Sequence, residues 1–364
     1  MHAFANVRMI KGPAIVDVNG ACHVLGKDVS GHTISVRPGK AIPFEPSTRC
    51  RLCVSLGTGG KMWKANIGDA GTFMWRDIAR DISASADNKK FTVMLAGNSD
   101  TGKSTLSTYL ANFVRGHGLV PCIIDGDIGQ GDLAPPGSIG AAMLSGQIID
   151  LRDVSTHLFE FVGNISPAGF ERLIVRKLST ILKRGSLLGD ISIVNTDGYA
   201  RDAGVQYKLQ IANELSPDVI VCVGKNPALF EALRDGPWRL LRAKASNQTP
   251  KSKSDRISRR LDQFLRYVGD GETFAELWKV EFEYKNRLFS QSELSHPPIK
   301  QLEKENLKSM FVGLCLSKKV IGFGIVRGIV KDKIYIKTNV KNFDRLYLSN
   351  IRLPSNMFGE IRND

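Results

Sequence analysis

The chain has 364 residues, of which 42% are hydrophobic and 24% are charged, a balance typical of globular proteins. This length suffices for roughly two or three domains, each with its own core, which excludes a small disulfide-stapled protein. The sequence contains no run of roughly eighteen apolar residues, so a membrane-spanning helix is excluded as well.

The formal net charge is +14, and the location of this excess along the chain matters more than its size. The first residues, MHAFANVRMIKGPAIV, lack the charged, apolar and small-residue order of a secretory signal. We therefore expect a cytoplasmic protein with no membrane partner.

Residues 1–87 alternate apolar and polar positions between Gly and Pro, as in GPAIVDVNGACHVLG. This pattern predicts a β-rich N-terminal domain. Cys50 and Cys53 form a C-x-x-C pair in this region, but no second pair or histidine follows at ligand spacing. We interpret them as two thiols in a strand and not as a zinc site.

Residues 88–275 are predicted to form an α/β domain. Apolar runs at FTVMLA, PCIIDGD, HLFEFVG, ISIVNTDG and DVIVCVG alternate with helical-period segments such as KSTLSTYLANFVRG. Buried strands separated by helices predict a parallel sheet with helices on both faces. Cys122 and Cys222 fall inside apolar runs, and we expect them to be small buried residues.

The segment VMLAGNSDTGKSTLSTYL leads from an apolar strand through a Gly-rich turn into a helix and fits G-x-x-x-x-G-K-[ST]. Backbone N–H groups and a helix N-terminus in this context bind phosphate oxygens. Lys103 is predicted to reach the β- and γ-phosphates of ATP or GTP, and Ser104 to ligate Mg²⁺. The predicted nucleotide-binding residues are Gly97, Asn98, Ser99, Asp100, Thr101, Gly102, Lys103, Ser104 and Thr105.

Polar clusters follow three other strands, in DGDIGQGD, GNISPAG and NTDGYARDAG. Ligands of such sheets bind beyond the carboxyl ends of the strands, so these loops are predicted to share one site. Asp125 and Asp127 point to the same side of a strand. One carboxylate would serve Mg²⁺ and the other would accept a proton from an attacking hydroxyl. The alternative is a metal-binding acid followed by a turn residue, serving hydrolysis by water. Gln130 is close to both, whereas His157 is expected only to flank a strand.

The segment from about 234 to 270 is the most basic part of the chain, with ten basic and four acidic residues. Such a block forms either a solvated helix face or an anion-binding lid. Residues 276–364 become strand-like again, most clearly in MFVGLCLSKKVIGFGIVRGIVKDKIYIKTN, which predicts a C-terminal β-rich domain.

The motifs GNSDTGKST, DGDIGQGDLAPPG, FVGNISPAG and VNTDGYARDAGVQYK occur in this order along the chain. In these motifs and their spacing the chain resembles the polynucleotide 5′-hydroxyl kinase family. That family includes the pre-mRNA cleavage-complex kinase, the nucleolar pre-rRNA-processing kinase and their archaeal relatives, and the PPG element is most similar to the archaeal branch. The resemblance covers nearly the whole chain, because the family flanks its P-loop kinase domain with two smaller domains.

The resemblance implies Mg²⁺-dependent transfer of the γ-phosphate of ATP or GTP to the 5′-hydroxyl end of RNA or DNA, in RNA processing or repair. It implies catalytic roles for Lys103, Asp127 and the arginines of a lid helix, Arg256, Arg259 and Arg260. The implied metal ligands are Ser104, Asp125 and Gln130. The implied acceptor-binding residues are Asp127, Gln130, Thr196, Gly198 and Tyr199.

The sequence departs from the family at Tyr199, where the family usually has a tryptophan that packs on the terminal base. Tyrosine still offers a stacking face, with a smaller area. The loop at Ser166–Pro167 matches a family segment near the nucleotide but lacks its threonine-rich form.

Two other functions stay open. One is a non-catalytic nucleotide-binding subunit of an RNA-processing complex, against which the intact Lys103, Ser104 and Asp127 argue. The other is a P-loop ATPase or GTPase without an acceptor, of the signal-recognition or partitioning type. Those proteins commonly carry a lysine just after the first loop glycine, where this chain has Asn98. No particular protein partner is predicted.

Overall fold

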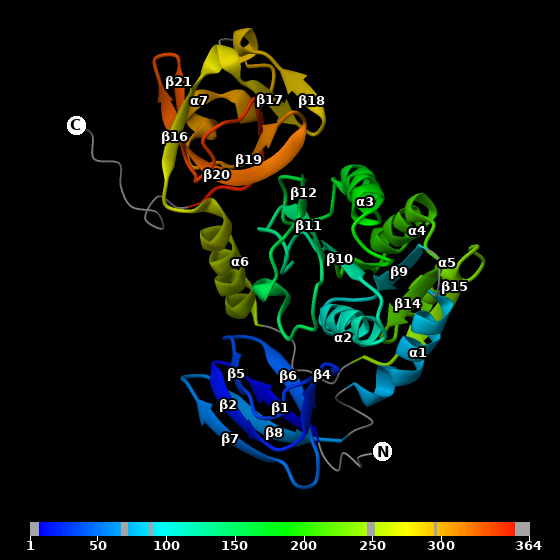
Figure 1. Cartoon of the computed structure of the whole chain (residues 1–364). Helices are drawn as coiled ribbons and strands as arrows, with labels where there is room; N and C mark the ends of the chain where they lie inside the picture. The colour runs from blue at the N-terminus through cyan, green and yellow to red at the C-terminus, as the bar shows by residue number, and fades with distance from the viewer. Residues whose placement is uncertain (1–6, 67–71, 87–89, 246–251, 295–296, 354–364) are drawn as a thin grey trace. The chain divides into compact units, whose positions relative to one another are not determined.

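Figure 1 shows the computed structural model of the chain, which describes residues 7–66, 72–86, 90–245, 252–294 and 297–353. The chain forms two compact units. Unit 1 comprises Met1–Ile124, Ala142–Ser155 and Leu182–Arg259, and unit 2 comprises Asp125–Ala141, Thr156–Ile181 and Arg260–Asp364. Each unit therefore combines segments that are far apart in the sequence.

Two β-sheets form the N-terminal part of unit 1 (Figure 1). One has the strand order β4-β3-β6-β1-β8 and the other β5-β2-β7. Alternate residues of both sheets, among them Val16, Val24 and Phe44, pack into one core, as in a β-sandwich. This confirms the expected β-rich N-terminal region. The strands are β1 (Val7–Lys11), β2 (Ala14–Asn19), β3 (Cys22–Val24), β4 (Lys27–Asp28), β5 (Thr33–Val36), β6 (Ala41–Pro46), β7 (Arg51–Leu56) and β8 (Lys61–Ala65).

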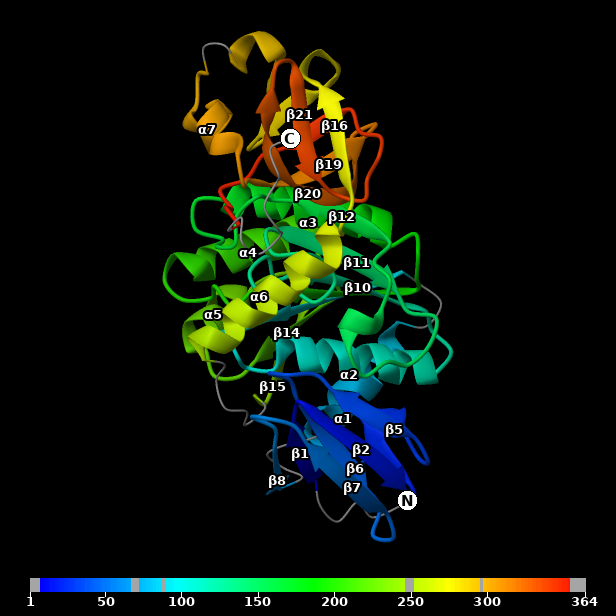
Figure 2. The same cartoon turned by 90° about the vertical axis from the view of Figure 1, so that its left-hand side faces the viewer.

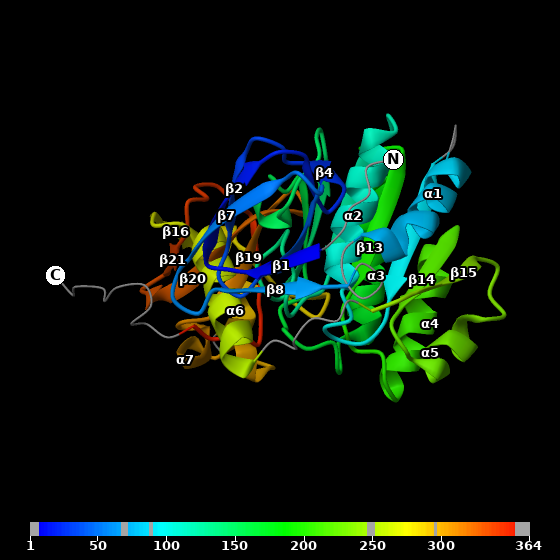
Figure 3. The same ribbon diagram turned by 90° about the horizontal axis from the view of Figure 1, so that it is seen from below.

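The α/β part of unit 1 is built on strands in the order β10-β13-β9-β14-β15. Strands β13, β9, β14 and β15 run parallel to their neighbours. Every residue of β13 and β14 is buried, as in a sheet covered on both faces. Figure 3 shows α1 and α2 on one side of these strands and α4 and α5 on the other. The expected P-loop α/β fold is confirmed.

The elements of this part follow in chain order. They are η1 (Phe73–Trp75), α1 (Arg76–Ser85), β9 (Phe91–Ala96), α2 (Lys103–Gly116), β10 (Pro121–Gly126), η2 (Leu151–Asp153), β13 (Ile191–Thr196), α4 (Ala203–Leu215), β14 (Val219–Val223), α5 (Pro227–Leu233) and β15 (Arg239–Ala243). Strand β10 passes from unit 1 into unit 2 after Ile124.

Helix α2 shares its buried surface with the N-terminal sandwich. The Asn112 side chain is fully buried, and its Nδ2 donates to the carbonyl oxygens of Leu25 and Ile148, each at 2.7 Å. Its Oδ1 accepts from the backbone N–H of Ile148 at 2.8 Å. Both sides of this amide, the NH₂ group and the oxygen, thus join the sandwich, α2 and the segment before η2.

An ion-pair network also joins the sandwich to the α/β part. The Lys40 ammonium lies 3.0 Å from the carboxylate of Asp150, which Arg152 also contacts at 3.0 Å. Burial alone would raise the pKa of Asp150, but the positive charges of Lys40 and Arg152 hold that pKa well below its usual range.

The C-terminal part of unit 2 is a seven-stranded sheet with the order β16-β21-β20-β19-β22-β17-β18 (Figure 2). Phe161, Phe264, Phe311 and Phe323 form an aromatic core on one side of it. The expected C-terminal β-rich region is confirmed. Its elements are β16 (Glu272–Glu276), η3 (Leu277–Lys279), β17 (Glu281–Tyr284), β18 (Arg287–Phe289), η4 (Gln291–Leu294), η5 (Lys300–Leu302), α7 (Lys304–Leu307), β19 (Phe311–Leu316), β20 (Lys319–Val330), β21 (Lys333–Lys337) and β22 (Arg345–Tyr347).

Strands β11 (Ser138–Met143) and β12 (Leu158–Phe161) pair antiparallel, unlike the parallel neighbours of unit 1. His157 directly precedes β12, at the strand flank where it was expected. Helices α3 (Glu171–Gly185) and α6 (Lys253–Val268) each begin in one unit and end in the other.

Two of the cysteines are small buried residues, as the sequence predicted. Cys122 and Cys222 are buried, and burial raises the pKa of each thiol to about 12. Across the described ranges, no three His, Cys, Asp or Glu side chains gather into a group able to hold a metal ion. None of the described helices has the length and apolar character needed to cross a bilayer.

Candidate active site

The phosphate loop connects β9 to α2 within unit 1. Gly97 and Gly102 have φ angles of 149° and 96°, and Asp100 has a φ angle of 59°. A Cβ atom at Gly97 would lie 2.4 Å from the carbonyl oxygen of Val223, so only glycine fits there. The Thr101 hydroxyl donates to the Asn98 carbonyl oxygen at 3.0 Å. The loop therefore has the strand–turn–helix context that phosphate binding requires.

Lys103 and Ser104 open helix α2. Lys103 is only 6% exposed, and its ammonium donates to the carbonyl oxygens of Gly97 at 2.9 Å and Asn98 at 2.7 Å. The Ser104 hydroxyl accepts a hydrogen bond from Nδ2 of the buried Asn195 at 3.2 Å. The sequence did not single out Asn195, which lies one residue before the end of β13. Its contact orients a hydroxyl oxygen, the kind of ligand that Mg²⁺ prefers.

The loop after β13 packs directly on the phosphate loop. A Cβ atom at Gly198 would lie 2.1 Å from Oγ of Ser99 and 2.7 Å from its backbone nitrogen. Nδ2 of Asn226 donates to Oδ1 of Asn98 at 3.0 Å and to the carbonyl oxygen of Ala200 at 2.7 Å. The structure therefore brings the predicted Asn98, Ser99 and Gly198 together and adds Asn226, the N-cap residue of α5.

The backbone of Tyr199 is hydrogen-bonded to a buried ion pair, Asp197 with Lys208. The Asp197 carboxylate accepts from the backbone N–H of Tyr199 at 2.8 Å, the hydroxyl of Tyr207 at 2.9 Å and the ammonium of Lys208 at 2.8 Å. Lys208 is fully buried. The half-buried Tyr199 ring lies 6.0 Å from the ring of Tyr207. Sequence reasoning missed Asp197 and Lys208, although a lysine within the apolar face of a helix was a usable signal.

Thr196 differs in placement from the expectation. It is the last residue of β13 and is 1% exposed, and its hydroxyl donates to the carbonyl oxygen of Leu95 at 2.8 Å. The side chain thus lies in the interior of the sheet and not in a loop open to an acceptor. The physical reason is that a strand-end threonine can satisfy a carbonyl of the neighbouring strand.

The first turns of α6 contact the phosphate loop within unit 1. Nη2 of Arg256 lies 2.5 Å from Oδ2 of Asp100, and Asp255 lies 3.9 Å from the ammonium of Lys11 in β1. Asp100 is thereby held by an arginine from the predicted lid helix. Of the other two predicted arginines, Arg259 also belongs to unit 1, and Arg260 belongs to unit 2.

The arginines are concentrated in one helix of the basic block. Residues 239–243 of that block form β15, the edge strand of the α/β sheet, and only 253–268 form the helix α6. Residues 246–251 lie outside the described part of the chain. Arg260 makes no hydrogen bond or ion pair with any described residue.

The predicted acids lie in unit 2, in the loop that follows β10. Asp125 is 2% exposed, and its carboxylate accepts from the backbone N–H groups of Asp127 at 3.3 Å and Asp132 at 2.6 Å. Oδ1 of Asp127 accepts from the backbone N–H groups of Gly129 at 3.1 Å and Gln130 at 2.9 Å, as in an Asx-turn. Oδ2 of the half-buried Asp127 makes no hydrogen bond with a described residue, so this oxygen is available to a ligand.

The last turns of α6 hold this acid loop in place. Nε2 of the buried Gln263 donates to the carbonyl oxygens of Gly131 at 3.1 Å and Asp132 at 3.0 Å. The hydroxyl of Tyr267, one turn further on, donates to the carbonyl oxygen of Leu133 at 2.7 Å, and burial raises its pKa. Gln263 and Tyr267 were not predicted, but their spacing of four residues on one helix face was visible in the sequence.

The loop at Ser166–Pro167 also belongs to this set. A Cβ atom at Gly129 would lie 2.9 Å from the carbonyl oxygen of Ile165, so the two loops touch within unit 2. Unit 1 thus joins the phosphate loop, Gly198 and Arg256, and unit 2 joins Asp125, Asp127 and Gln130. The first set can bind phosphate groups, and the second offers one buried and one accessible carboxylate.

Known proteins resemble this chain in the region of these motifs. Residues 97–269 match the family model described as mRNA cleavage and polyadenylation factor CLP1 P-loop. A polyribonucleotide 5′-hydroxyl-kinase of Pyrococcus horikoshii is 29% identical over 274 residues, which span 73% of each chain. Its counterpart in Thermococcus kodakarensis is 27% identical over 272 residues, 73% of this chain and 72% of the relative. The polyribonucleotide 5′-hydroxyl-kinase Clp1 of Xenopus tropicalis is 27% identical over 209 residues, 52% of this chain and 47% of the relative.

A solved structure extends the similarity to the flanking parts. The structure of a wild-type Clp1p–Pcf11p complex contains a chain that superposes with a TM-score of 0.71, covering 95% of this chain and 93% of that one. The sequences are 12% identical, so this likeness concerns the fold.

Proposed function

We propose that the chain is a polynucleotide 5′-hydroxyl kinase of the CLP1 type, which transfers the γ-phosphate of ATP or GTP to the 5′-hydroxyl end of RNA or DNA; its similarity to that family model and to archaeal kinases supports this. The contact between Gly198 and Ser99 carries the proposal, because it sets the loop assigned to the acceptor directly against the phosphate loop. A kinase needs this adjacency, since the acceptor oxygen must approach the γ-phosphorus.

The phosphate loop is assigned to the donor nucleotide. Backbone N–H groups from Gly97 to Thr105 would bind the phosphates, and the Lys103 ammonium would exchange its two loop carbonyls for β- and γ-oxygens. Lys103 then neutralises charge as the transferred group leaves.

The oxygen donors of the chain fit Mg²⁺. Ser104 offers a hydroxyl oriented by Asn195, Asp125 a buried carboxylate and Gln130 an amide oxygen. When bound, Mg²⁺ would neutralise negative charge on the phosphate groups of the nucleotide.

We assign the general base to Asp127, because its Oδ2 is free of hydrogen bonds with the described residues. In the transfer step the 5′-oxygen bonds to the γ-phosphorus while the bond from that phosphorus to the β–γ bridging oxygen breaks. The proton of the hydroxyl passes to Oδ2 of Asp127, and ADP or GDP leaves.

Side chains of α6 and the acceptor loop would complete the site. Arg256, Arg259 and Arg260 would stabilise the transferring group, with Arg256 released from Asp100 and Arg260 available without breaking a hydrogen bond or ion pair to a described residue. Tyr199 would stack on the terminal base, and Gly198 would allow the acceptor close to the loop. Thr196 supports the strand end and would not contact the acceptor.

The proposal is tested with γ-labelled ATP and GTP and short RNA and DNA strands that end in a 5′-hydroxyl. Matched strands that end in a 5′-phosphate are the control, since they have no acceptor oxygen. We expect label only on the hydroxyl-ended strands, and loss of roughly 10²- to 10³-fold in kcat for Lys103→Ala.

Two results would contradict the proposal. Release of labelled phosphate at the same rate with and without acceptor would indicate an ATPase or GTPase. Nucleotide binding with neither transfer nor hydrolysis would indicate a non-catalytic subunit.

A further inference from the structure

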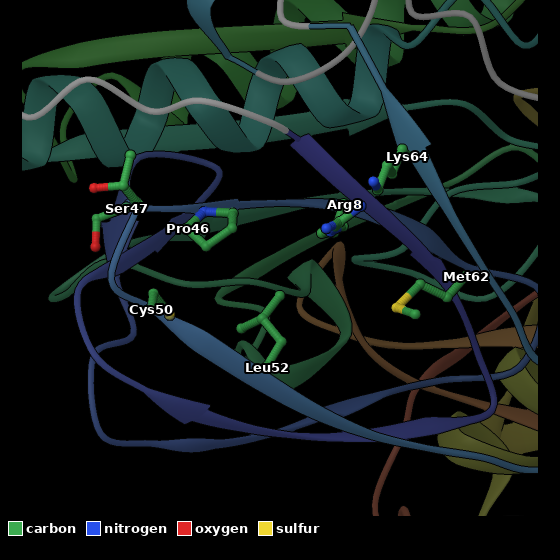
Figure 4. Close-up of a pocket in the computed structure, with 8 residues that line it drawn as sticks. Arg8, Pro46, Ser47, Cys50, Leu52, Met62 and Lys64 are labelled. Carbon is green, nitrogen blue, oxygen red and sulfur yellow. The ribbon is translucent and has the colours of Figure 1, made fainter.

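A cleft of about 500 Å³ opens at one end of the N-terminal sandwich, and none of its lining residues is assigned to the transfer step (Figure 4). Its walls come from the start of β1, the end of β8, the turn after β6 and the start of β7. Arg8 and Lys64 lie beside each other on one side, and Ser47 lies on the opposite side, with Leu52 between them.

The cleft holds two cations that no described residue neutralises. Arg8 and Lys64 are direct cross-strand neighbours in the β1–β8 pair, an arrangement that destabilises a sheet when the charges are alike. Neither side chain makes an ion pair or hydrogen bond with any described residue, and no Asp or Glu lines the cleft. The alternation of β1 places Arg8 on the same face as Ile10, which belongs to the sandwich core. An anionic ligand would remove this repulsion.

The remaining lining favours a phosphate that is attached to an apolar group. Ser47 and Thr48 add hydroxyl groups at the turn after β6, and these can donate to phosphate oxygens. Leu52 and the half-exposed Met62 add an apolar surface. Arginine and lysine beside an apolar wall suit a nucleotide unit, with its charged phosphate and its less polar sugar and base.

The strand that carries Arg8 also reaches the lid helix. Lys11, at the other end of β1, lies 3.9 Å from Asp255, and the next residue, Arg256, is paired with Asp100 of the phosphate loop. All four residues belong to unit 1. Strand β1 therefore links the cleft to the phosphate loop, where the 5′ end would react. This link favours the acceptor polynucleotide as the ligand of the cleft.

We infer that this cleft binds a phosphodiester of the acceptor strand, downstream of the nucleotide that is phosphorylated. The inference rests on the proposed function, because that function supplies a polynucleotide. The cleft gives the protein a preference for longer acceptors without reading their sequence, as backbone contacts do.

The test compares two double variants of the full chain, each of which removes two positive charges from the sandwich. Arg8→Gln with Lys64→Gln changes the cleft. Arg51→Gln with Lys61→Gln is the matched control, since both residues are exposed and neither lines the cleft. Binding of a labelled 5′-hydroxyl RNA of about twenty nucleotides is measured by fluorescence anisotropy over a range of salt concentrations.

We expect the cleft variant to weaken this binding about tenfold and to lower the salt slope by about 1.4, as the loss of two phosphate contacts on a single strand predicts. The control variant should change both much less. Transfer to a dinucleotide acceptor should stay at the wild-type rate in both variants, because the inferred contact is to a phosphodiester further downstream. Lys64→Arg should keep wild-type binding.

Three results would overturn the inference. The cleft and control variants could lose affinity equally, which would indicate only a general charge effect. The dinucleotide reaction could fall with the long-RNA affinity, which would place the cations in the reaction itself. Inorganic phosphate or a mononucleotide could bind at lower concentration than RNA and displace it only when Arg8 and Lys64 are both present. That result would indicate a small-molecule site. Binding is measured without catalysis, so an inactive protein would contradict the proposed function and leave this test intact.

Discussion

The position of a Cβ atom on Gly198 lies 2.1 Å from Oγ of Ser99, a distance at which two such atoms cannot coexist. The loop after β13 and the phosphate loop therefore fit together only with glycine at this position. We predict that Gly198→Ala displaces one loop from the other and lowers kcat/KM by at least about 10²-fold, because small misplacements of reacting groups are costly. The variant should raise the KM of both nucleotide and acceptor.

Gly146→Ala is the control for this prediction, because a Cβ atom there would meet nothing within 4 Å. It should retain wild-type kinetics. Full activity in Gly198→Ala would show that the two loops do not need to touch.

The two acids should respond differently to removal of their charge. Asp127→Asn keeps the size of the side chain but cannot accept a proton, so kcat should fall by about 10²- to 10⁴-fold with nucleotide affinity nearly unchanged. Asp125→Asn should instead weaken Mg²⁺ binding and raise the Mg²⁺ concentration needed for half-maximal activity, because the buried Asp125 accepts two backbone N–H groups and is assigned to the metal. Kinetics at several Mg²⁺ concentrations distinguish the two, and the opposite pattern would reverse the assignments.

Tyr199 offers a test of acceptor stacking. Loss of one base–aromatic stack costs about 1–3 kcal/mol, so Tyr199→Ala should raise the acceptor KM by about five- to 150-fold and leave the nucleotide KM unchanged. Tyr199→Trp should match or improve on the native residue, because the indole ring offers a larger face. If Tyr199 serves only to pack against Tyr207, the alanine variant should instead melt at a lower temperature and impair both KM values equally.

The ion pairs of Asp150 predict a pH dependence of stability. Lys40 and Arg152 lower the pKa of the folded carboxyl, so the folded state binds this proton less readily than the unfolded state. The resulting stabilisation is complete above the unfolded pKa, about 3.9, and is lost as the pH falls through the lower, folded pKa. Asp150→Asn should cost about 3–5 kcal/mol at pH 7, and the difference should shrink in acid.

Urea unfolding at pH 7 and at pH 3 would measure this effect. Asp77→Asn serves as the control, because the Asp77 side chain is 96% exposed in its pair with Arg80. We expect it to change stability little at either pH. An equal loss for Asp150→Asn at both pH values would rule out the charge as its cause.

The strands and the phosphate loop could be predicted from the sequence because their signals are local. Apolar runs mark buried strands wherever they pair, and the glycines of the phosphate loop are required by the loop's own backbone. The contacts of Asn226 and Lys208 could not be predicted in the same way. Each joins segments whose neighbourhood exists only after folding, as Asn226 does between Asn98 and Ala200.

Thr196 shows that a motif can locate a residue correctly and still not predict the contact of its side chain. The motif correctly located the end of β13, but it did not show that the hydroxyl would be used up by the Leu95 carbonyl of the neighbouring strand. A motif fixes position along the chain, whereas the direction of a side chain depends on the partner that packing supplies.

The amide of Asn112 makes the N-terminal sandwich an integral part of the α/β structure. A shortened chain without residues 7–66 would lose the Leu25 carbonyl that Asn112 contacts and uncover the apolar side of α2 around Tyr109. Helix α2 begins at the phosphate loop, so disorder in it would reach Lys103 directly. The nucleotide site of this protein therefore depends on the N-terminal sandwich, and a chain trimmed to its central motifs would lose that support.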